Sequence, residues 1–203
     1  MNPIDDASLE STLAFLRAAE ALKNQTRTAW TSAGKRESVA EHSWRLCLMA
    51  VVFREQLGDV DLAKLLKLCV VHDLGEAIAG DISAKVQAQR RIDDPDAPHK
   101  SAEERQHLLE LTAPLPRPMR DDIVAMWDEY EGAATSEARL AKGFDKLETI
   151  LQHNQGANPP DFDYGFNLDY GREYTSGHPL LAAIRKLLDA DTRAHALRKA
   201  AAP

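Results

Sequence analysis

The stretch LLKLCVVHDLGEAIAGDI, residues 65–82, changes its chemical character halfway along. It begins as an apolar helical pattern, with Leu62, Leu65, Leu66 and Cys69 on one face. Where that face would continue, one imidazole and three carboxylates follow instead: His72, Asp73, Glu76 and Asp81. Burying such groups is unfavourable unless something pairs with them, and divalent metal ions bind both imidazole and carboxylate ligands. The stretch therefore predicts a metal site on the inner side of a helix.

Composition limits the class of protein. With 203 residues and 44% hydrophobic content, the chain can bury the core of one domain. No run approaches eighteen apolar residues and the N-terminus is acidic, so we expect no membrane span and no targeting peptide. A net charge of −7 without a long basic run argues against binding of a nucleic acid duplex. Cys47 and Cys69 lie in apolar helical patterns, which predicts buried, reduced thiols and a cytoplasmic protein.

Apolar residues recur at helical spacing in a succession of segments. We expect helices from Asp6 or Ser8 to Lys23, from Ser38 to Gly58, from Asp61, from Ser101 to Leu111, from Arg120 to Tyr130, from Thr135 to Asn154 and from Pro179. Residues 24–37, 83–100 and 156–178 have the composition of loops, and no strand is expected. The fold class predicted is all-α, a compact helical bundle. We expect a single domain over residues 1–203, with its metal-binding core at 22–155, a loop at 156–178 and a final helix at 179–198.

Several of these helices have predicted core residues. Leu9, Leu13 and Leu16 repeat along the first helix, and Trp44 and Trp127 stand at core spacing in theirs. The final helix is expected to bury four residues: Leu180, Ile184, Leu187 and Leu188.

Candidate metal ligands stand on three separate predicted helices. His42 lies on the apolar stripe of the second helix, His72 and Asp73 follow the third, and Asp145 lies at the edge of the stripe at 140–151. Two imidazoles and two carboxylates suit a divalent ion that keeps positions open for water. Glu76, one turn after His72, can hold a second ion, orient the attacking water or carry a proton.

Simpler explanations exist for each residue. A histidine on an apolar face is more often a hydrogen-bonded core residue, and Asp145 could be a solvated residue paired with Lys142 or Lys146. Asp81, after Gly80, could be a turn residue. Arg27 could be solvated in a polar loop, and Trp30 could be a core residue. Spacing alone does not show that the helices converge.

The chain resembles a known family in its motifs and their order. His42, then His72–Asp73, then Asp145 are similar to the H…HD…D signature of HD-domain metal-dependent phosphohydrolases. The runs ESVAEHSWR (37–45), VVHDLGEAIAGDI (70–82) and the segment 128–152 with DEYE, SEA and DKLETILQ resemble the small 5′-deoxynucleotidases, of the HD domain-containing protein 2 type and the bacterial YfbR type. The similarity extends from about Leu22 to Gln155.

The resemblance implies a compact helical bundle with the metal held by His42, His72, Asp73 and Asp145. It implies that Glu76 and Asp81 line the reaction centre, as catalytic groups or as ligands of a second ion. An arginine fifteen residues before the first histidine orients the phosphate in the bacterial branch, and Arg27 stands at that distance. That branch has tryptophan directly after the arginine, whereas this chain has Thr28 there and Trp30 two places on.

The implied substrates are deoxyribonucleoside 5′-monophosphates, hydrolysed to nucleoside and phosphate by attack of a metal-activated water. Arg27, Trp30, Asp73, Asp81 and Asp145 are the expected substrate-binding residues. The metal can be Mn, Co, Mg, Fe or Zn, since His and carboxylate ligands accept all of them. The resemblance and the apolar final helix suggest a homodimer.

Rival hypotheses follow from the same residues. An HD-type phosphodiesterase or alarmone hydrolase would share the metal but not a monophosphate pocket. A di-iron HD oxygenase needs further histidines between Asp73 and Asp145, where the chain offers His99 and His107. A metal-free helical interaction module would bind no ion at all.

Overall fold

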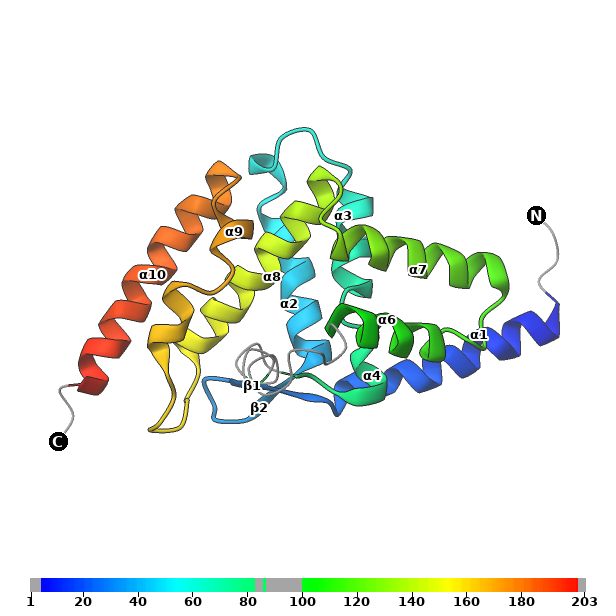
Figure 1. Cartoon of the computed structure of the whole chain (residues 1–203), viewed down its shortest axis with the longest axis horizontal. Helices are drawn as coiled ribbons and strands as arrows, with labels where there is room; N and C mark the ends of the chain where they lie inside the picture. The colour runs from blue at the N-terminus through cyan, green and yellow to red at the C-terminus, as the bar shows by residue number, and fades with distance from the viewer. Residues whose placement is uncertain (1–4, 83–85, 87–99, 201–203) are drawn as a thin grey trace.

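The computed structural model describes residues 5–82, 86 and 100–200, and helices dominate these parts of the chain (Figure 1). In chain order the longer helices are α1 (Asp6–Ala19), α2 (Val39–Val52), α3 (Leu62–Val71), α6 (Lys100–Leu111), α7 (Arg117–Glu131), α8 (Ser136–Gln155) and α10 (Pro179–Ala200). Short helical turns are η1 (Glu20–Lys23), η2 (Arg54–Gln56), α4 (Glu76–Ala79), η3 (Tyr164–Leu168) and α9 (Arg172–Thr175). The all-α prediction is confirmed, and none of the described helices has the length and apolarity needed to cross a membrane.

Helix starts follow the predicted capping residues in most cases. Ser38 accepts from the backbone of Glu41, whose carboxylate returns to Ser38, so the capping box of α2 is present. Asp61 caps α3 and Thr135 caps α8 through their side-chain oxygens. The first helix is capped by Asp5 instead of Asp6 or Ser8.

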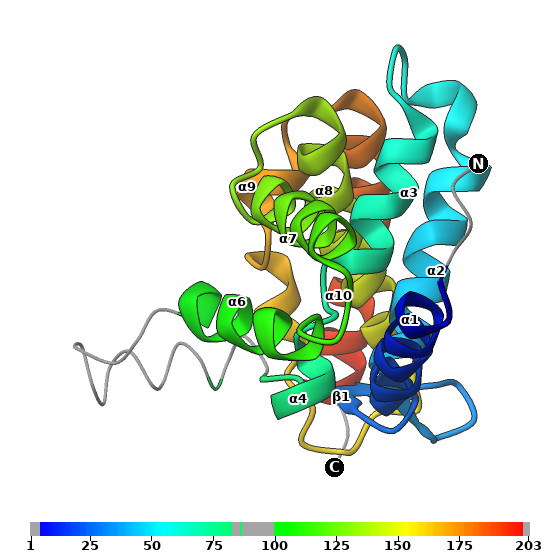
Figure 2. The ribbon, with the colours of Figure 1, turned by 90° about the vertical axis from the view of Figure 1, so that its right-hand side faces the viewer.

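Helix α8 lies at the centre of the fold. Fourteen of its twenty residues are buried, on every side of the helix, which is the pattern of a central core element. It packs against α2, α3, α7 and α10, and Figure 1 shows it crossing between the α2–α3 pair and α10. Phe144, Leu147 and Ile150 of α8 join Leu46 of α2 and Leu65 of α3 in one apolar cluster. Figure 2 shows α2 and α3 side by side against this core.

A second apolar cluster joins α1, α6 and α7 to the end of α3. Phe15, Leu108, Leu111 and Trp127 are buried in it. The indole of Trp127 donates to the backbone carbonyl of His72 at 3.0 Å, so this cluster also fixes the chain where the metal motif begins.

The segment expected to be an irregular loop forms a β-hairpin instead. Strands β1 (Thr26–Trp30) and β2 (Arg36–Ser38) pair antiparallel around a turn with Gly34 at a φ of +80°. Thr and Trp favour strands, but five residues with turn residues on both sides give too short a pattern to recognise. Similarly, 156–178 contains η3 and α9, each too short to have a visible helical period.

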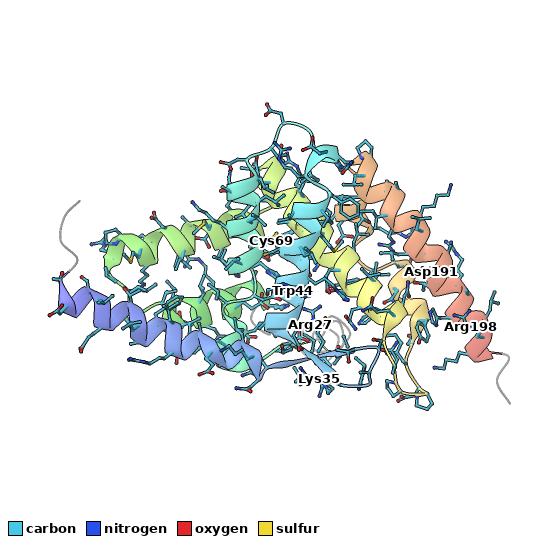
Figure 3. The ribbon with its side chains drawn as sticks, turned by 180° about the vertical axis from the view of Figure 1, so that it is seen from behind. Arg27, Lys35, Trp44, Cys69, Asp191 and Arg198 are labelled. Atoms are coloured by element: carbon cyan, nitrogen blue, oxygen red, sulfur yellow. The ribbon has the colours of Figure 1, made fainter. Side chains whose placement is uncertain are left out.

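Several predicted core residues are exposed. Trp44 on α2 is 65% exposed and Leu187 on α10 is 69% exposed. Figure 3 shows Trp44 on the outer face of α2. Leu9, Leu13 and Leu16 are also exposed, because α1 buries Phe15 on its other side. Of the predicted loop 83–100, Lys100 begins α6, and residues 83–85 and 87–99, including Pro95, Pro98 and His99, lie outside the described residues.

Two smaller expectations also differ from the structure. Helix α7 begins at Arg117 instead of Arg120, with Pro118 in its first turn, where a missing amide proton does no harm. Cys47 and Cys69 are free thiols, but only Cys69 is fully buried.

Candidate metal centre and substrate cavity

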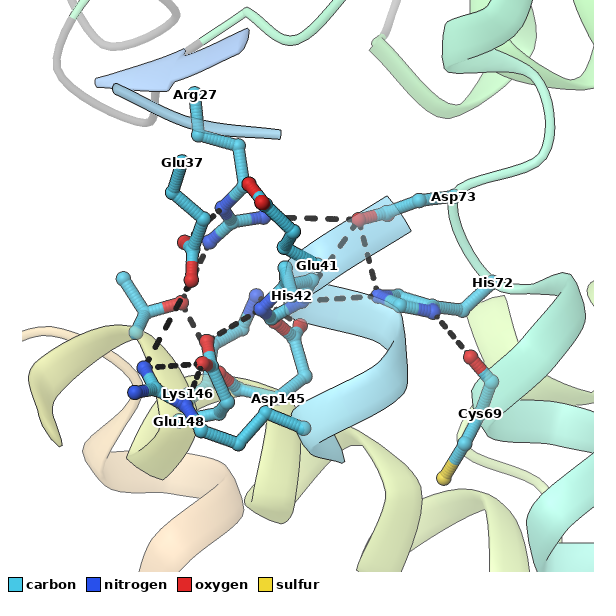
Figure 4. A network of polar contacts seen from close by, with 12 residues as sticks. Arg27, Glu37, Glu41, His42, Cys69, His72, Asp73, Asp145, Lys146 and Glu148 are labelled. Atoms are coloured by element: carbon cyan, nitrogen blue, oxygen red, sulfur yellow. Dashed lines mark hydrogen bonds and ion pairs between the residues drawn. The ribbon is translucent and has the colours of Figure 1, made fainter. Parts of the chain in front are cut away.

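Four candidate ligands converge on one point in the core (Figure 4). The Nε2 atoms of His42 and His72 are 3.3 Å apart, and Oδ1 of Asp145 is 3.3 Å from Nε2 of His42. Oδ2 of Asp73 lies 3.0 Å from Nε2 of His72 and 3.8 Å from Nε2 of His42. Residues from α2, α3 and α8, far apart in sequence, thus bring two imidazoles and two carboxylates together.

The end of α3 explains how neighbouring His72 and Asp73 reach the same point. The helix stops at Val71, His72 is its C-cap, and Asp73 lies in the turn before α4. Successive residues on a helix point about 100° apart, so leaving the helix here allows both side chains to face the cluster.

Both histidines have their tautomers fixed from behind. Nδ1 of His72 donates to the carbonyl of Cys69 at 2.8 Å, and Nδ1 of His42 donates to the carboxylate of Glu148. Each imidazole therefore presents the lone pair of Nε2 to the centre, the arrangement found for metal-bound histidines. Glu148 was not a predicted site residue. Its position three residues after Asp145 on the same helix was the available signal.

Asp145 is held by two donors on one oxygen and faces the histidines with the other. The hydroxyl of Tyr130 and the ammonium of Lys146 both donate to Oδ2, each at 2.9 Å, which leaves Oδ1 facing the two histidines. Although burial opposes it, the charge of Lys146 and the bond to His42 hold the pKa of Asp145 well below its usual range. The alternative of a solvated Asp145 is wrong: it pairs with Lys146, but it is buried.

Arg27 reaches the centre from β1 and is held on three sides. Nη2 donates to Oγ1 of Thr149 at 2.8 Å, Nη1 is 3.6 Å from Oδ2 of Asp73, and Nε is 3.4 Å from Glu37. Against the effect of burial, the carboxylates, Asp73 foremost, raise the pKa of Arg27 above its ordinary value. The alternative of a solvated arginine in a polar loop is therefore wrong.

A chain of alternating charges connects Arg27 to His42. Glu37 lies between Arg27 and Arg45, and Arg45 donates to Glu148 at 2.6 Å. Burial, and then the charge of Glu148, raise the pKa of Glu37 to about 7. The polar network behind the candidate ligands is thus itself built from partners of opposite charge.

Glu76 and Asp81 line the cavity beside the same centre. Glu76 is buried, and its Oε2 has no hydrogen-bonding partner among the described residues. Burial, with the charges of Asp73 and Asp81, raises the pKa of Glu76 to about 9. Burial also raises the pKa of Asp81. At neutral pH Glu76 therefore carries a proton in the metal-free protein.

A cavity of about 710 Å³ opens over this cluster. Every predicted site residue except His42 lines it: Arg27, Trp30, His72, Asp73, Glu76, Asp81 and Asp145. His42 is fully buried beneath. Much of the opposite wall comes from residues 159–174, including Phe162, Phe166, Tyr170 and Tyr174. That wall was not predicted, because the composition of residues 156–178 indicates a loop and does not point to a site.

The donor set fits a divalent cation. Two Nε2 lone pairs 3.3 Å apart and two carboxylates repel one another unless positive charge lies among them. Against burial and the charge of Arg27, the carboxylates of Glu148 and Asp145 raise the pKa of His42 to about 10. The centre attracts positive charge, and a proton takes that role when no ion is bound.

Helical bundle, ligand cluster and sequence agree on one class of protein. The profile of the HD domain family matches residues 19–185, and the chain belongs to this family. The predicted resemblance to HD-domain phosphohydrolases is confirmed.

Particular relatives are similar over most of the chain. One named 5′-deoxynucleotidase HDDC2, from Dictyostelium discoideum, is 30% identical over 193 residues, which span 89% of this chain and 98% of the relative. The human protein of the same name is 32% identical over 147 residues, covering 71% of this chain and 68% of the relative. The crystal structure of a predicted metal-dependent phosphohydrolase from Magnetospirillum magnetotacticum superposes with a TM-score of 0.79 at 25% identity, covering 98% of each chain.

Proposed function

We propose that this protein is a metal-dependent phosphohydrolase that cleaves deoxyribonucleoside 5′-monophosphates to nucleoside and phosphate, acting as a single HD domain. One observation carries the proposal: the ligand atoms of His42, His72, Asp73 and Asp145 converge beside the guanidinium of Arg27, at the base of one cavity. The names of the relatives from Dictyostelium and human support the nucleotide substrate.

His42, His72, Asp73 and Asp145 would hold the ion, and Glu76 with Asp81 would hold a second one if two are used. When bound, a divalent ion lowers the pKa of a water molecule and withdraws charge from the phosphoryl group. Mn, Co, Mg, Fe and Zn all suit these ligands, so the ion is to be identified by measurement.

The chain's own residues bind the substrate and handle protons. Arg27 binds the phosphoryl oxygens and balances the charge that grows on them, since its fork of donors matches a phosphate. Glu76 donates a proton to the leaving 5′-oxygen, and Asp81 orients the water. Trp30 packs against the sugar.

The test is phosphate release from protein stripped of metal and resupplied with one ion at a time. The panel holds deoxy- and ribonucleoside monophosphates, cyclic nucleotides and alarmones. Activity on deoxynucleoside monophosphates that requires metal and is lost in Asp73→Asn is the expected result. Asp169→Asn serves as a matched control, because the side chain of Asp169 is almost fully exposed and, among the described residues, pairs only with Arg172.

Failure has a definite form. Release from cyclic nucleotides or alarmones alone would replace the proposal with the phosphodiesterase or alarmone hydrolase reading. No release from a folded, metal-loaded protein would reject it. Iron content with oxygen uptake would indicate the oxygenase, although His107 on α6 is not among the residues that line the cavity.

Arg27 gives an independent test. Arg27→Met should lower kcat/KM by about 100-fold, and Arg27→Lys should restore only part of it, because lysine keeps the charge but not the fork. Arg54→Met removes an arginine whose side chain donates to the carbonyl of Gly58, away from the cavity lining, and should leave kcat/KM unchanged.

We further infer a cytoplasmic homodimer. Trp44, Leu48 and Val51 form an exposed apolar strip on α2, and this strip is the surface where a second copy would bind. Both cysteines are free thiols, which is the usual state in the cytoplasm. Sedimentation of the protein and of Trp44→Lys tests the dimer: the substitution should give monomers.

A further inference from the structure

Helix α8 presents three residues to the cavity at equal intervals. Asp145, Thr149 and His153 all line it and stand four residues apart, so they are spaced about 6 Å from one another along the helix axis. Asp145 belongs to the candidate metal cluster, Thr149 accepts from Arg27 at 2.8 Å, and the ring of His153 packs edge-on against Phe162 at 4.9 Å. One rigid element therefore orders the metal cluster, the phosphate arginine and an aromatic cluster.

Strand β1 repeats the same order from the opposite side. It carries Arg27 and, three residues later, Trp30, and both line the cavity. In a regular strand residues three apart point to opposite faces. Here Thr26 pairs with Ser38 and Trp30 pairs with Arg36, so β1 has more residues between the two pairs than β2 has. This irregularity in the register changes the direction in which the side chains of β1 point.

The aromatic cluster at the far end is open to the cavity. Phe162 lies 6.4 Å from Trp30 at an interplanar angle of 87°, and both rings are partly exposed and line the cavity. A cluster that served only packing would be buried. Tyr164, the next ring in the same segment, packs edge-on against Phe162 at 4.9 Å and stacks on His195, but it does not line the cavity.

We propose that Phe162 forms the subsite on which the nucleobase of the substrate stacks, with Trp30 beside it at the sugar. This inference rests on the proposed function, since a 5′-mononucleotide carries phosphate, sugar and base in the order in which α8 and β1 present metal cluster, arginine and aromatic rings. Every base has a π-face, so stacking accepts all of them, and the enzyme should discriminate weakly among bases.

The experiment compares a substrate that has a base with one that lacks it. Phe162→Leu keeps an apolar side chain but removes the ring. It should lower kcat/KM for deoxyadenosine 5′-monophosphate by roughly five- to hundredfold, mainly through KM, and leave kcat/KM for 2-deoxyribose 5-phosphate unchanged. Phe162→Tyr should behave like wild type.

Equal losses on both substrates in Phe162→Leu would show that the ring only packs the cavity wall and would overturn the subsite. Unchanged kinetics on the nucleotide would overturn it as well. If wild type hydrolyses neither compound, the proposed function fails separately. Calorimetric binding of the two compounds then decides: the subsite requires Phe162→Leu to weaken binding of the nucleotide alone, and equal affinities reject it.

Discussion

Glu148 accepts a hydrogen bond from Nδ1 of His42, and both side chains are fully buried. The other carboxylate oxygen accepts from Arg45 at 2.6 Å. Glu148 thus fixes the ring orientation of a candidate metal ligand while its own charge is compensated by an arginine.

Glu148→Gln should weaken metal binding by about 10- to 100-fold, the usual effect of losing the partner behind a ligating histidine. The amide has nearly the same shape but no charge, so the imidazole is held less firmly and is a poorer donor. Calorimetric titration with Mn²⁺ measures the change. Arg45→Met is the control for loss of the arginine contact alone, and an affinity drop equal to that of Glu148→Gln would contradict the assigned role.

Tyr130→Phe should weaken metal binding by about tenfold with little change in thermal stability. The substitution removes the hydroxyl that donates to Oδ2 of Asp145, and this bond helps to aim Oδ1 at the histidines. Tyr174→Phe removes a hydroxyl from the same cavity and should leave the affinity as it is. Identical affinities for wild type and Tyr130→Phe would show that Lys146 alone positions the carboxylate.

Gly171→Ala should destabilise the protein by more than about 1–2 kcal/mol, the penalty for a left-handed residue. Gly171 has a φ of +64°, and a Cβ there would lie 2.4 Å from Cγ of Lys146. Urea unfolding provides the measurement. Gly177→Ala is the matched control. Gly177 has an ordinary φ, and a Cβ added there would meet no atom within 4 Å, so this substitution should change the free energy of unfolding by less than about 0.5 kcal/mol.

His153 should make stability fall in acid. Burial lowers its pKa from 6.5 to about 4, so between these values the unfolded chain binds a proton that the folded protein does not. The stabilisation that results from the neutral His153 is fully present above pH 6.5 and is lost as the pH falls toward 4. The free energy of unfolding should decrease by roughly 3 kcal/mol over this range. Urea unfolding of wild type and His153→Gln at pH 7.5 and 4.5 should show a smaller pH dependence in the variant. If the free energy of unfolding changes equally with pH in wild type and in His153→Gln, the lowered pKa of His153 is refuted.

Much of the fold and the metal cluster could be predicted from sequence, since both depend on strong local patterns. The stripes of α2, α3 and α8 were long, and polar residues interrupted them at His42 and His72, which is a conspicuous anomaly in a core. The family resemblance supplied the statement that spacing lacked, namely that these helices converge.

What escaped prediction depends on tertiary context. Glu148 looks like any helix carboxylate until His42 is seen to point at it. Trp44 has the spacing of a core residue, yet it faces outward. Helical periodicity shows that one side of a helix is apolar, but it does not show which part of the protein covers that side. The hairpin and α9 were too short to carry a period.

Most of the aromatic residues that line the cavity lie on a different part of the chain from the candidate metal ligands. The candidate metal ligands come from α2, the end of α3 and α8. Four rings of the cavity wall, Phe162, Phe166, Tyr170 and Tyr174, come from residues 159–174. Arg185 of α10 anchors that wall by donating to the carbonyls of Asn167, Leu168 and Tyr170. His153, which bonds Asn167, and Lys199, which donates to the carbonyl of Phe162, also hold this segment. Substitutions of the cavity-facing rings can therefore change which phosphoesters are accepted while the candidate metal ligands stay in place.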